Sequence, residues 1–345
     1  MHMADALISP AVGGTMWAAT AGLIAYSSKK VKEELDDHKV PLMGVLGAFI
    51  FAAQMINFTI PATGSSGHLG GGMILAILLG PYAAFLVMAS VLTVQALFFA
   101  DGGLLALGCN IFNLGFFPCF VAYPFIFKRI VGGQASQGRI LTGAMVSAVI
   151  GLQLGAFGVV LQTLFSGISE LPFGTFVLLM QPIHLAIGIV EGLVTAAVVG
   201  FVWKARPEIV TAVSSPSEGR SSMRTVLVGL SAIAILTGVA LSWFASANPD
   251  GLEWAMFKTS GSEELENPEH GLHGSLAHLQ EKTAFLPDYG FKTEGGEPEA
   301  SAEAHTPWPA VDAGTSVAGL VGGILTLLMA GMIGLGLKRR RNNVK

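Results

Sequence analysis

The clearest chemistry in this sequence lies in its first two residues and in one later histidine. Met1 and His2 offer an α-amine, a backbone amide nitrogen and an imidazole Nδ1, which can bind one ion through fused five- and six-membered rings. Three nitrogens then lie close to one plane and leave a fourth corner open, which His68 could fill. Planar nitrogen donors suit Ni2+ or Cu2+, whereas tetrahedral, sulfur-rich sites suit Zn2+. The alternative is that a histidine at position 2 is incidental.

His68 lies in a stretch that suits a binding loop, TIPATGSSGHLGGGM at residues 59–73. Glycine at this density lets the backbone approach other segments closely. The stretch follows one apolar run and leads into another, and irregular backbone at membrane depth must be buried in protein or line a cavity. We therefore expect this loop to lie inside the protein.

Further polar side chains occur inside otherwise apolar stretches. His184 and Glu191 are seven residues apart, so they share one helix face, and ionisable groups within a membrane are functional candidates by default. They could instead form a buried pair that fixes helix packing, or they could orient the metal ligands as outer hydrogen-bond partners. The stretch 95–113 adds polar residues around a turn at Asp101, which could bond a central loop or hold helices together. We expect these side chains around the pocket: Asp5, Ser66, Gln95, Asp101, Asn110, Asn113, His184 and Glu191.

The composition places the chain in the membrane class. Of 345 residues, 52% are hydrophobic and only 12% are charged, whereas a soluble domain carries about 25% charged residues. This excludes an ordinary soluble fold. The two cysteines, Cys109 and Cys119, lie in one apolar stretch and are expected to be buried free thiols.

The apolar runs predict an all-α integral membrane protein, because a hydrocarbon core of about 30 Å needs about 20 helical residues. The third run is short and flanked by glycines, which is typical of a broken or re-entrant helix. The predicted architecture is a seven-helix bundle with two further transmembrane helices. The seven spans lie near 10–27, 41–57, 69–79, 82–99, 104–127, 140–165 and 174–203, and the two others near 224–246 and 315–337.

Basic residues set the predicted orientation. They cluster after the first, fifth and seventh spans and at the C-terminus, which places these segments in the cytoplasm and the N-terminus outside, across an inner or plasma membrane. The polar stretch 205–223 is typical of a cytoplasmic linker between one module at 1–204 and another at 224–345.

The outer loop 247–313 is acidic and poor in aliphatic residues, so we expect it to be only partly ordered. One interpretation is a solvated acidic loop. The other is that it gathers cations and helps to load or release the main site, because it also holds His270, His273, His278 and His305.

Four segments together resemble one known family: MHMADALISP, GSSGHLGGGM, QALFFADGGLLALGCNIFN and HLAIGIVEG. Over roughly residues 1–203 the chain is similar to the substrate-binding component of nickel/cobalt energy-coupling-factor transporters, the NikM/CbiM family. The resemblance implies a compact bundle in which an extra N-terminal helix joins a six-helix core, and in which the N-terminal segment folds back into a central pocket. It also implies that the ion is held by the Met1 amine, the His2 amide and ring nitrogens, and His68.

Residues 224–337 resemble the family's small auxiliary component, two helices around an extracytoplasmic loop that contains NPDGLEWA at 248–255. That component is often a separate chain, and here we expect a fusion. Family members often carry an acidic residue and then glycine near position 5, whereas Asp5 is followed here by Ala6. The backbone after the chelate is therefore expected to differ.

The sequence contains no GxxxxGK[ST] phosphate loop. The resemblance therefore implies a transporter subunit that is not an enzyme, driven by a pair of cytoplasmic ATPases through a transmembrane coupling component. The cargo is expected to be Ni2+ or Co2+, with nickel favoured because planar nitrogen coordination and amide deprotonation suit it. Membrane lipid is the other expected partner, and nucleic acid is not expected.

Small residues recur at every fourth position on two predicted helices, and such stripes let another helix pack closely. That helix could belong to this chain or to the coupling component. The second stripe is favoured as the coupling contact because it lies on the first helix of the six-helix core. The two stripes are Gly14, Ala18 and Gly22, and Gly44, Ala48 and Ala52.

Two other classes of function fit parts of the sequence. GSSG at 64–67 matches the G-x-S-G signature of rhomboid-like intramembrane serine proteases, with Ser66 as nucleophile and His184 as general base. That scheme leaves the Met-His start and the C-terminal module without a role. A metal-independent channel or transporter would be lined by Gln95, Asp101, Asn110 and Glu191.

Overall fold

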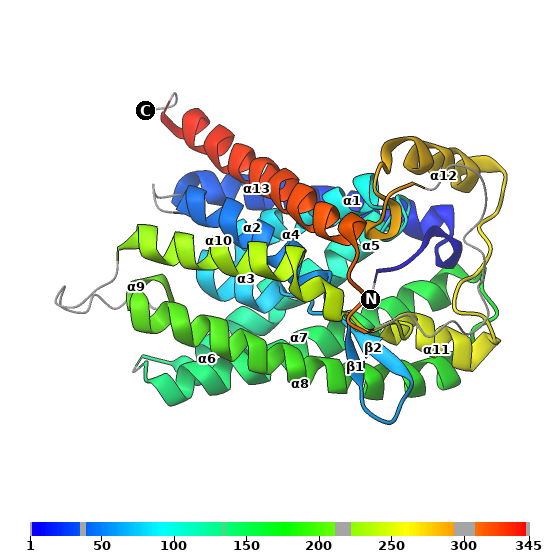
Figure 1. The fold of residues 1–345 in the computed structure, drawn as a ribbon, viewed down its shortest axis with the longest axis horizontal. Coiled ribbons are helices and arrows are strands. Elements are labelled where there is room, and N and C mark those ends of the chain that lie inside the picture. Colours follow the sequence, from blue (N-terminus) through cyan, green and yellow to red (C-terminus); the bar gives the residue numbers. More distant parts are fainter. Residues whose placement is uncertain (1, 35–38, 134, 211–221, 293–307, 343–345) are drawn as a thin grey trace.

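The computed structural model describes residues 2–34, 39–133, 135–210, 222–292 and 308–342, and within them the chain is almost entirely helical. Most helices run lengthwise in Figure 1, while a small hairpin and the helices α11 and α12 gather at one end. The hairpin is formed by β1 (Phe58–Ile60) and β2 (Ser65–Gly67), which pair antiparallel. The predicted all-α membrane fold is confirmed. The helices are η1 (Asp5–Leu7), α1 (Pro10–Glu34), α2 (Lys39–Gln54), α3 (Gly72–Leu79), α4 (Pro81–Phe98), α5 (Leu107–Ile111), η2 (Phe112–Phe127), α6 (Lys128–Val131), α7 (Gln137–Ser166), α8 (Phe173–Ala205), α9 (Pro207–Val210), α10 (Met223–Val239), η3 (Leu241–Phe244), α11 (Gly251–Ser260), α12 (Gly271–Thr283), η4 (Pro287–Tyr289) and α13 (Ala313–Asn342).

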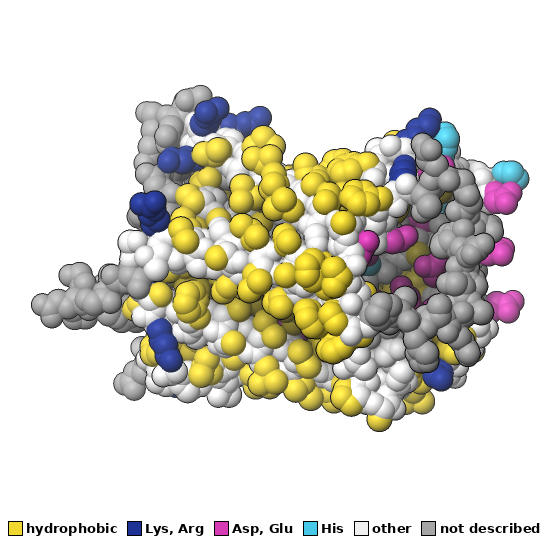
Figure 2. Space-filling view, viewed as in Figure 1, with side chains coloured by type: hydrophobic (Ala, Val, Ile, Leu, Met, Phe, Trp, Pro, Cys, Tyr) yellow, Lys and Arg dark blue, Asp and Glu magenta, His cyan; other side chains and the backbone are white. Residues whose placement is uncertain are grey.

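The surface has the layout of a multi-pass membrane protein. Five helical stretches are long and apolar enough to cross a membrane, namely α4, the continuous 107–131 segment, α7, α8 and most of α13, and α2 and α10 are shorter apolar helices. Figure 2 shows a broad apolar band across the middle of the molecule. Most Lys and Arg side chains lie at one end of that band, which we call the basic end, and Asp, Glu and His gather at the other, which we call the acidic end.

Each predicted span coincides with a helix, but the third does not cross alone. Helix α3 has eight residues, or about 12 Å at 1.5 Å per residue, well short of a core of about 30 Å. The chain reaches α3 from the hairpin through an irregular segment at 68–71 and reverses at Gly80, whose φ is +82°. The short run flanked by glycines is therefore an interrupted helix.

The fifth span departs from a regular α-helix. Residues Phe112–Phe127 form a long π-helical stretch that contains Pro118 and Pro124. Proline lacks the N–H that an α-helix needs and clashes with the carbonyl four residues before it, so the wider winding accommodates both prolines. A Cβ built on Gly72 would lie 2.5 Å from the Leu114 carbonyl oxygen and 2.6 Å from Pro118. Glycine at position 72 therefore lets α3 start directly against this segment.

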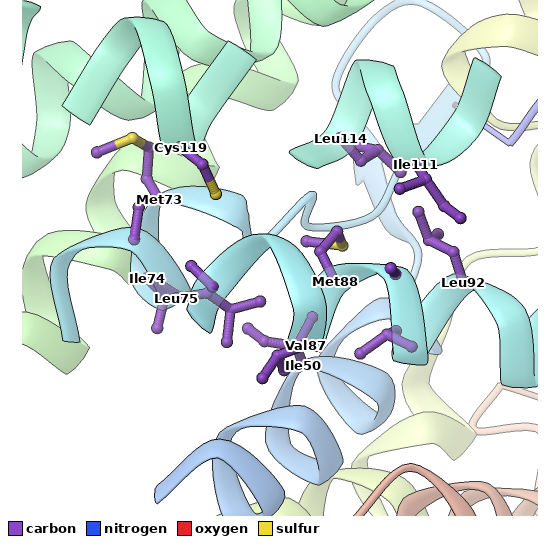
Figure 3. Packing of buried hydrophobic residues seen from close by; sticks show 14 of the residues in the cluster. Ile50, Met73, Ile74, Leu75, Val87, Met88, Leu92, Ile111, Leu114 and Cys119 are labelled. Carbon is purple, nitrogen blue, oxygen red and sulfur yellow. The ribbon is translucent and has the colours of Figure 1, made fainter. Parts of the chain in front are cut away.

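The core of the bundle lies where α2, α3, α4 and the 107–127 segment meet. Figure 3 shows side chains from these elements packed together, including Ile50, Met73, Met88 and Leu114, all of them buried. Both cysteines are buried and free, as expected. This core fixes the inner walls against which the polar segments at the acidic end are folded.

The structure favours internal packing, one of the two alternatives, for the second small-residue stripe. Helix α13 lies along α2 (Figure 1), and a Cβ built on Gly44 would already lie 3.0 Å from the backbone oxygen of Leu327. In this structure the stripe of Gly44, Ala48 and Ala52 is thus packed against a helix of this chain. By contrast, the stripe of Gly14, Ala18 and Gly22 is exposed on α1.

The acidic loop contains more structure than its composition predicts. Residues 251–260 form α11 and residues 271–283 form α12, and both lie at the acidic end, α11 beside the hairpin (Figure 1). Aliphatic residues are few there, but Asp250 caps α11 and both helices pack on the bundle. His305 lies outside the described residues.

Candidate metal centre

The N-terminal segment is held inside the bundle by backbone contacts. The Met3 amide donates to Asn110 Oδ1 at 2.8 Å, and the Met3 carbonyl accepts from Asn110 Nδ2 at 3.1 Å and from the Gly103 amide at 2.9 Å. Asp5 Oδ1 accepts from the Ala106 amide at 2.9 Å. Met3 is fully buried. These bonds join residues about 100 positions apart and fix where His2 lies.

Glycine is required where the N-terminal segment crosses the 99–106 loop. A Cβ built on Gly103 would lie 1.9 Å from Asp5 Oδ1 and 2.5 Å from the Asp5 amide nitrogen. Gly102 has a φ of +81°, a conformation that favours glycine. The Gly102-Gly103 pair therefore lets two backbones meet at the edge of the site.

His2 is oriented by a short chain of polar groups. Its Nδ1 lies 2.7 Å from Asp101 Oδ1, while the other carboxylate oxygen accepts a hydrogen bond from the Tyr289 hydroxyl. Burial alone would raise the pKa of Asp101, but the His2 ring and the Tyr289 hydroxyl hold that pKa below its usual range. Asp101 is thus an anion that fixes the plane of the His2 ring. His2 Nε2 is buried without a hydrogen-bond partner in the structure.

His68 follows β2 and stacks on His2. The two ring centroids are 4.9 Å apart and the planes are inclined by 29°. His68 Nδ1 lies 3.1 Å from the Leu69 carbonyl oxygen. A carbonyl oxygen only accepts, so Nδ1 carries the hydrogen and Nε2 carries the lone pair. Burial lowers the pKa of His68 to about 3, so the ring is neutral at physiological pH and can bind a cation.

The glycine-rich segment after His68 is held by one carboxylate. Glu191 accepts from the Gly70 amide through Oε2 and from the Gly71 amide through Oε1, each at 3.0 Å. Gln54 Nε2 donates to the Gly70 carbonyl at 2.9 Å, and Gln95 Nε2 donates to Gln54 Oε1 at 3.0 Å. Glu191 therefore acts on His68 through the backbone that follows it.

The segment 248–253 covers the hairpin and the His68 ring. Ser66 donates through its hydroxyl to the Asn248 carbonyl at 2.8 Å and through its amide to the Pro249 carbonyl at 2.8 Å. Asp250 Oδ1 accepts from the first amides of α11, and Glu253 completes the reciprocal cap. The second oxygen, Oδ2, lies 3.9 Å from His68 Nε2. A carboxylate from the far end of the chain therefore faces the histidine.

A second group of contacts ties the C-terminal half to the N-terminal segment. His273 Nε2 lies 2.9 Å from the Ile8 carbonyl oxygen, and His273 is buried. Gln280 Nε2 donates to the carbonyl oxygens of Ala96 and Gly102, each at 2.8 Å. His273 is thus engaged in packing and is not a free cation-gathering side chain.

The polar residues that the sequence assigns to a pocket lie around these two histidines, with different partners. Asp5, Asp101 and Asn110 hold the N-terminal segment, and Glu191 and Gln95 support the His68 loop as described above. Asn113 pairs with Gln162 at 2.7 Å and lies 3.9 Å from Met3 Sδ. Met1 lies outside the described residues. Among the described residues, no three His, Cys, Asp or Glu side chains form a group that could hold a metal ion.

Both alternative functions lose their structural basis. Ser66 is bonded to the Asn248 carbonyl, and His184 Nδ1 is bonded to the Met180 carbonyl at 2.8 Å, so neither group is paired as a nucleophile and base. The side chains proposed to line a pore are instead bonded to the backbone or to each other, and Gln95, Asn110 and Glu191 are buried. They support two loops and do not line a channel.

Several residues of this centre escaped the sequence analysis. Hydrogen bonds that hold this centre also come from five further residues: Gln54, Gln162, Asp250, Tyr289 and Gln280. All except Asp250 lie in sequence surroundings that carry no recognisable pattern. Only Asp250 had a usable signal, because Asp250 and Glu253 in NPDGLEWA form a helix-start pattern. The contact between that helix start and His68 depends on how the two halves of the chain meet.

Comparisons with known proteins give two family matches, one in each half of the chain. The family model described as the cobalt uptake substrate-specific transmembrane region, CbiM, matches residues 2–209, and the PDGLE domain model matches residues 224–339. A putative fused nickel transport protein NikMN of Archaeoglobus fulgidus is 30% identical over 95% of this chain and 96% of its own. The fused nickel transport protein NikMN of Rhodobacter capsulatus is 31% identical over 84% of this chain and 88% of its own.

A solved structure extends the comparison to three dimensions. The crystal structure of a truncated transition metal transporter superposes with a TM-score of 0.53 at 29% identity, and the match covers 59% of this chain and 99% of that one.

In sequence, the cobalt transport protein CbiM of Geobacter sulfurreducens is 27% identical over 70% of this chain and 71% of its own.

Proposed function

This chain belongs to the CbiM family of cobalt-uptake substrate-specific transmembrane proteins, and from that premise we propose that it is the substrate-binding component of an ATP-driven energy-coupling-factor importer for Ni2+ or Co2+. Residues 1–204 form its metal-binding module, 205–223 a cytoplasmic linker, and 224–345 a fused auxiliary module with its outer loop at 247–313. The transport names of relatives that carry both halves support this assignment.

The proposed ligands are the Met1 amine, the His2 amide and ring, and His68. The observation that carries the proposal is the stacking of His2 on His68, with centroids 4.9 Å apart, in a buried site reached by a tightly held N-terminal segment. Two imidazole rings buried side by side can bind one ion between them, and imidazole is a good donor for Ni2+, Co2+ and Cu2+. The ion is the cargo of this site.

Binding through the fused rings requires His2 to turn over. The chelate uses Nδ1, which in this structure faces Asp101 Oδ1 at 2.7 Å. Rotation about the Cβ–Cγ bond exchanges Nδ1 with Cδ2 and Nε2 with Cε1. After the rotation alone Cδ2 faces Asp101, so a hydrogen bond from Nε2–H to this carboxylate, of the kind common for metal-bound histidines, also requires the Asp101 side chain to shift. Nδ1 is then turned away from Asp101 and toward the ion. Planar coordination by amine, amide and two imidazole nitrogens favours nickel over cobalt.

The energy for import comes from other subunits in this proposal, a transmembrane coupling component and two cytoplasmic ATPases. The exposed stripe of Gly14, Ala18 and Gly22 on α1 is the surface proposed for the coupling component, because α13 covers the other stripe. The basic end faces the cytoplasm and the acidic end faces outward, as the distribution of Lys and Arg favours.

The test compares two forms of the purified chain, one with a single residue added before Met1 and one with a C-terminal tag. An added residue turns the terminal amine into an amide and moves the new amine out of register with the ring. We expect the tagged form to bind Ni2+ tightly and the extended form to lose binding by more than 100-fold, measured by calorimetry. Equal affinity of the two forms would exclude Met1 as a ligand.

A further inference from the structure

His184 has a nitrogen for which the described structure gives no partner. The residue lies on α8 and is 1% exposed. Its Nδ1 lies 2.8 Å from the Met180 carbonyl oxygen, which can only accept, so Nδ1 carries the hydrogen and Nε2 carries the lone pair. Nε2 is buried and makes no hydrogen bond. A buried acceptor without a partner is unfavourable and calls for an explanation.

His184 and His68 line the same small cavity. The space open to a water-sized particle is about 10 Å³, which is the size of one water or one dehydrated ion. Asp250 and Gly251 form part of its wall, and the remaining wall is apolar, with Leu152 among the lining residues. A Cβ built on Gly251 would lie 3.1 Å from His184 Cε1. The turn that carries Asp250 therefore sits directly against the His184 ring.

The residues on either side of His68 contact α8 just beyond His184: a Cβ built on Gly67 would lie 2.4 Å from Ile187, and one built on Gly70 would lie 3.0 Å from Glu191 Oε2. Helix α8 starts at the acidic end and ends at the basic end (Figure 1), so His184 lies on the acidic-end side of these contacts. His184 is not one of the ligands proposed for the chelate. It adds a further nitrogen donor beside His68 to a wall that also contains Asp250.

We infer that His184 Nε2 is a transfer ligand, which exchanges the cargo ion with His68 as the ion passes between the acidic end and the N-terminal chelate. This rests on the proposed function of metal import. Moving a divalent ion out of a nitrogen site into apolar surroundings is costly without a new ligand. An imidazole with its lone pair free and its tautomer fixed by Met180 supplies that ligand for Ni2+, Co2+ or Cu2+.

The decisive variant is His184→Asn. The side-chain NH2 of asparagine can keep the hydrogen bond to the Met180 carbonyl. The shorter side chain places no metal-binding atom at the position of Nε2. A second variant, His184→Gln, retains a weakly coordinating amide near the Nε2 position and guards against misfolding of the first. Leu152→Ile changes the wall of the same cavity without changing any donor and serves as the matched control.

Two quantities are measured for each variant, the equilibrium Kd for Ni2+ of the purified chain and the initial rate of 63Ni2+ uptake by the assembled transporter in proteoliposomes. For His184→Asn we expect the Kd to stay within threefold of wild type and uptake to fall at least tenfold. His184→Gln should fall between the two, and Leu152→Ile should match wild type in both.

The possible outcomes separate the claims. If His184→Asn imports at the wild-type rate, or if a folded His184→Gln does so where the first variant is lost, His184 does not handle the ion and the inference is overturned. A Kd that rises in parallel with the loss of uptake would assign His184 to the resting site, which also overturns it. A wild-type chain that binds and imports neither Ni2+ nor Co2+ overturns the proposed function, and the inference with it.

Discussion

Replacing Tyr289 by phenylalanine removes a single hydroxyl group from the contact between the two halves of the chain. That hydroxyl donates to Asp101, and the other oxygen of Asp101 faces Nδ1 of His2. The aromatic ring remains, because its stacking on Phe99, with centroids 5.2 Å apart, needs no oxygen. The substitution therefore tests whether Tyr289 positions His2 through Asp101, with little change in packing.

The expected effect follows from the chain of bonds. A hydrogen bond to a buried charged group contributes roughly 1.5–3 kcal/mol, and its loss leaves Asp101 with one donor fewer and more freedom to rotate. Loss of such an outer partner of a metal-bound histidine typically weakens metal binding by about 10–100-fold, or roughly 1.4–2.7 kcal/mol. We expect the Kd for Ni2+ to rise within this range, and the melting temperature in detergent to fall slightly.

The assay is calorimetric titration of the purified chain with Ni2+, run beside Tyr26→Phe. Tyr26 is half-exposed on α1 and loses the same hydroxyl away from the site, so this control should bind like wild type. Asp101→Asn should weaken binding at least as much as Tyr289→Phe, because it removes the charge as well. If Tyr289→Phe binds within twofold of wild type while Asp101→Asn is impaired, the hydroxyl does not position His2 and the reasoning is refuted.

Three further outcomes are expected. Gly103→Ala places a methyl group 1.9 Å from Asp5 Oδ1 and should displace the N-terminal segment. The affinity for Ni2+ should fall more than 100-fold, while circular dichroism still shows a folded helical protein. Unchanged affinity would mean that the N-terminal segment is held differently. Asn110→Leu removes both side-chain bonds to the Met3 backbone and should raise the Kd for Ni2+ about 10-fold or more, with dissociation rather than association changed in stopped-flow traces. Burial lowers the pKa of His68 from about 6.5 to about 3, so below pH 6.5 the unfolded chain binds a proton that the folded chain does not bind. The free energy of unfolding therefore decreases as the pH falls, by at most roughly 1.4 kcal/mol per pH unit. The melting temperature of the metal-free protein should drop between pH 7 and 5, and His68→Asn should flatten this dependence.

The fold was largely predictable from the sequence because lipid imposes simple rules. Apolar runs predicted a helix near each expected span, and five of the described helical stretches are long and apolar enough to cross a membrane. The distribution of basic residues separated the two ends of the bundle. The type of helix at 112–127 was not predictable, because the π-helical stretch depends on how Pro118 and Pro124 are accommodated against α3. The packing of α13 on the Gly44 stripe was not predictable either, because a stripe of small residues shows that some helix can pack there but does not show which helix.

The candidate site was predictable in part. His2, His68, Asp101 and Asn110 stand out by residue type in apolar or glycine-rich surroundings, and the structure brings them together. Tyr289 was not predictable, because a lone tyrosine in an acidic loop has no pattern that links it to Asp101. Its role arises from tertiary contacts between segments 188 residues apart.

The contacts between the two halves have a thermodynamic consequence for the fusion. Tyr289 orients His2 through Asp101, His68 faces Asp250, and His273 contacts the Ile8 carbonyl of the N-terminal segment. The proposed chelate and the docking of the C-terminal half therefore depend on the same groups. If docking strengthens metal binding by some factor, bound metal must strengthen docking by the same factor. Joining the halves covalently raises the effective concentration of the C-terminal segment, and it keeps that segment near the site when the ion leaves. In the proposed importer, with such a positive coupling, release of the ion weakens the contact while the covalent link keeps the C-terminal half near the site.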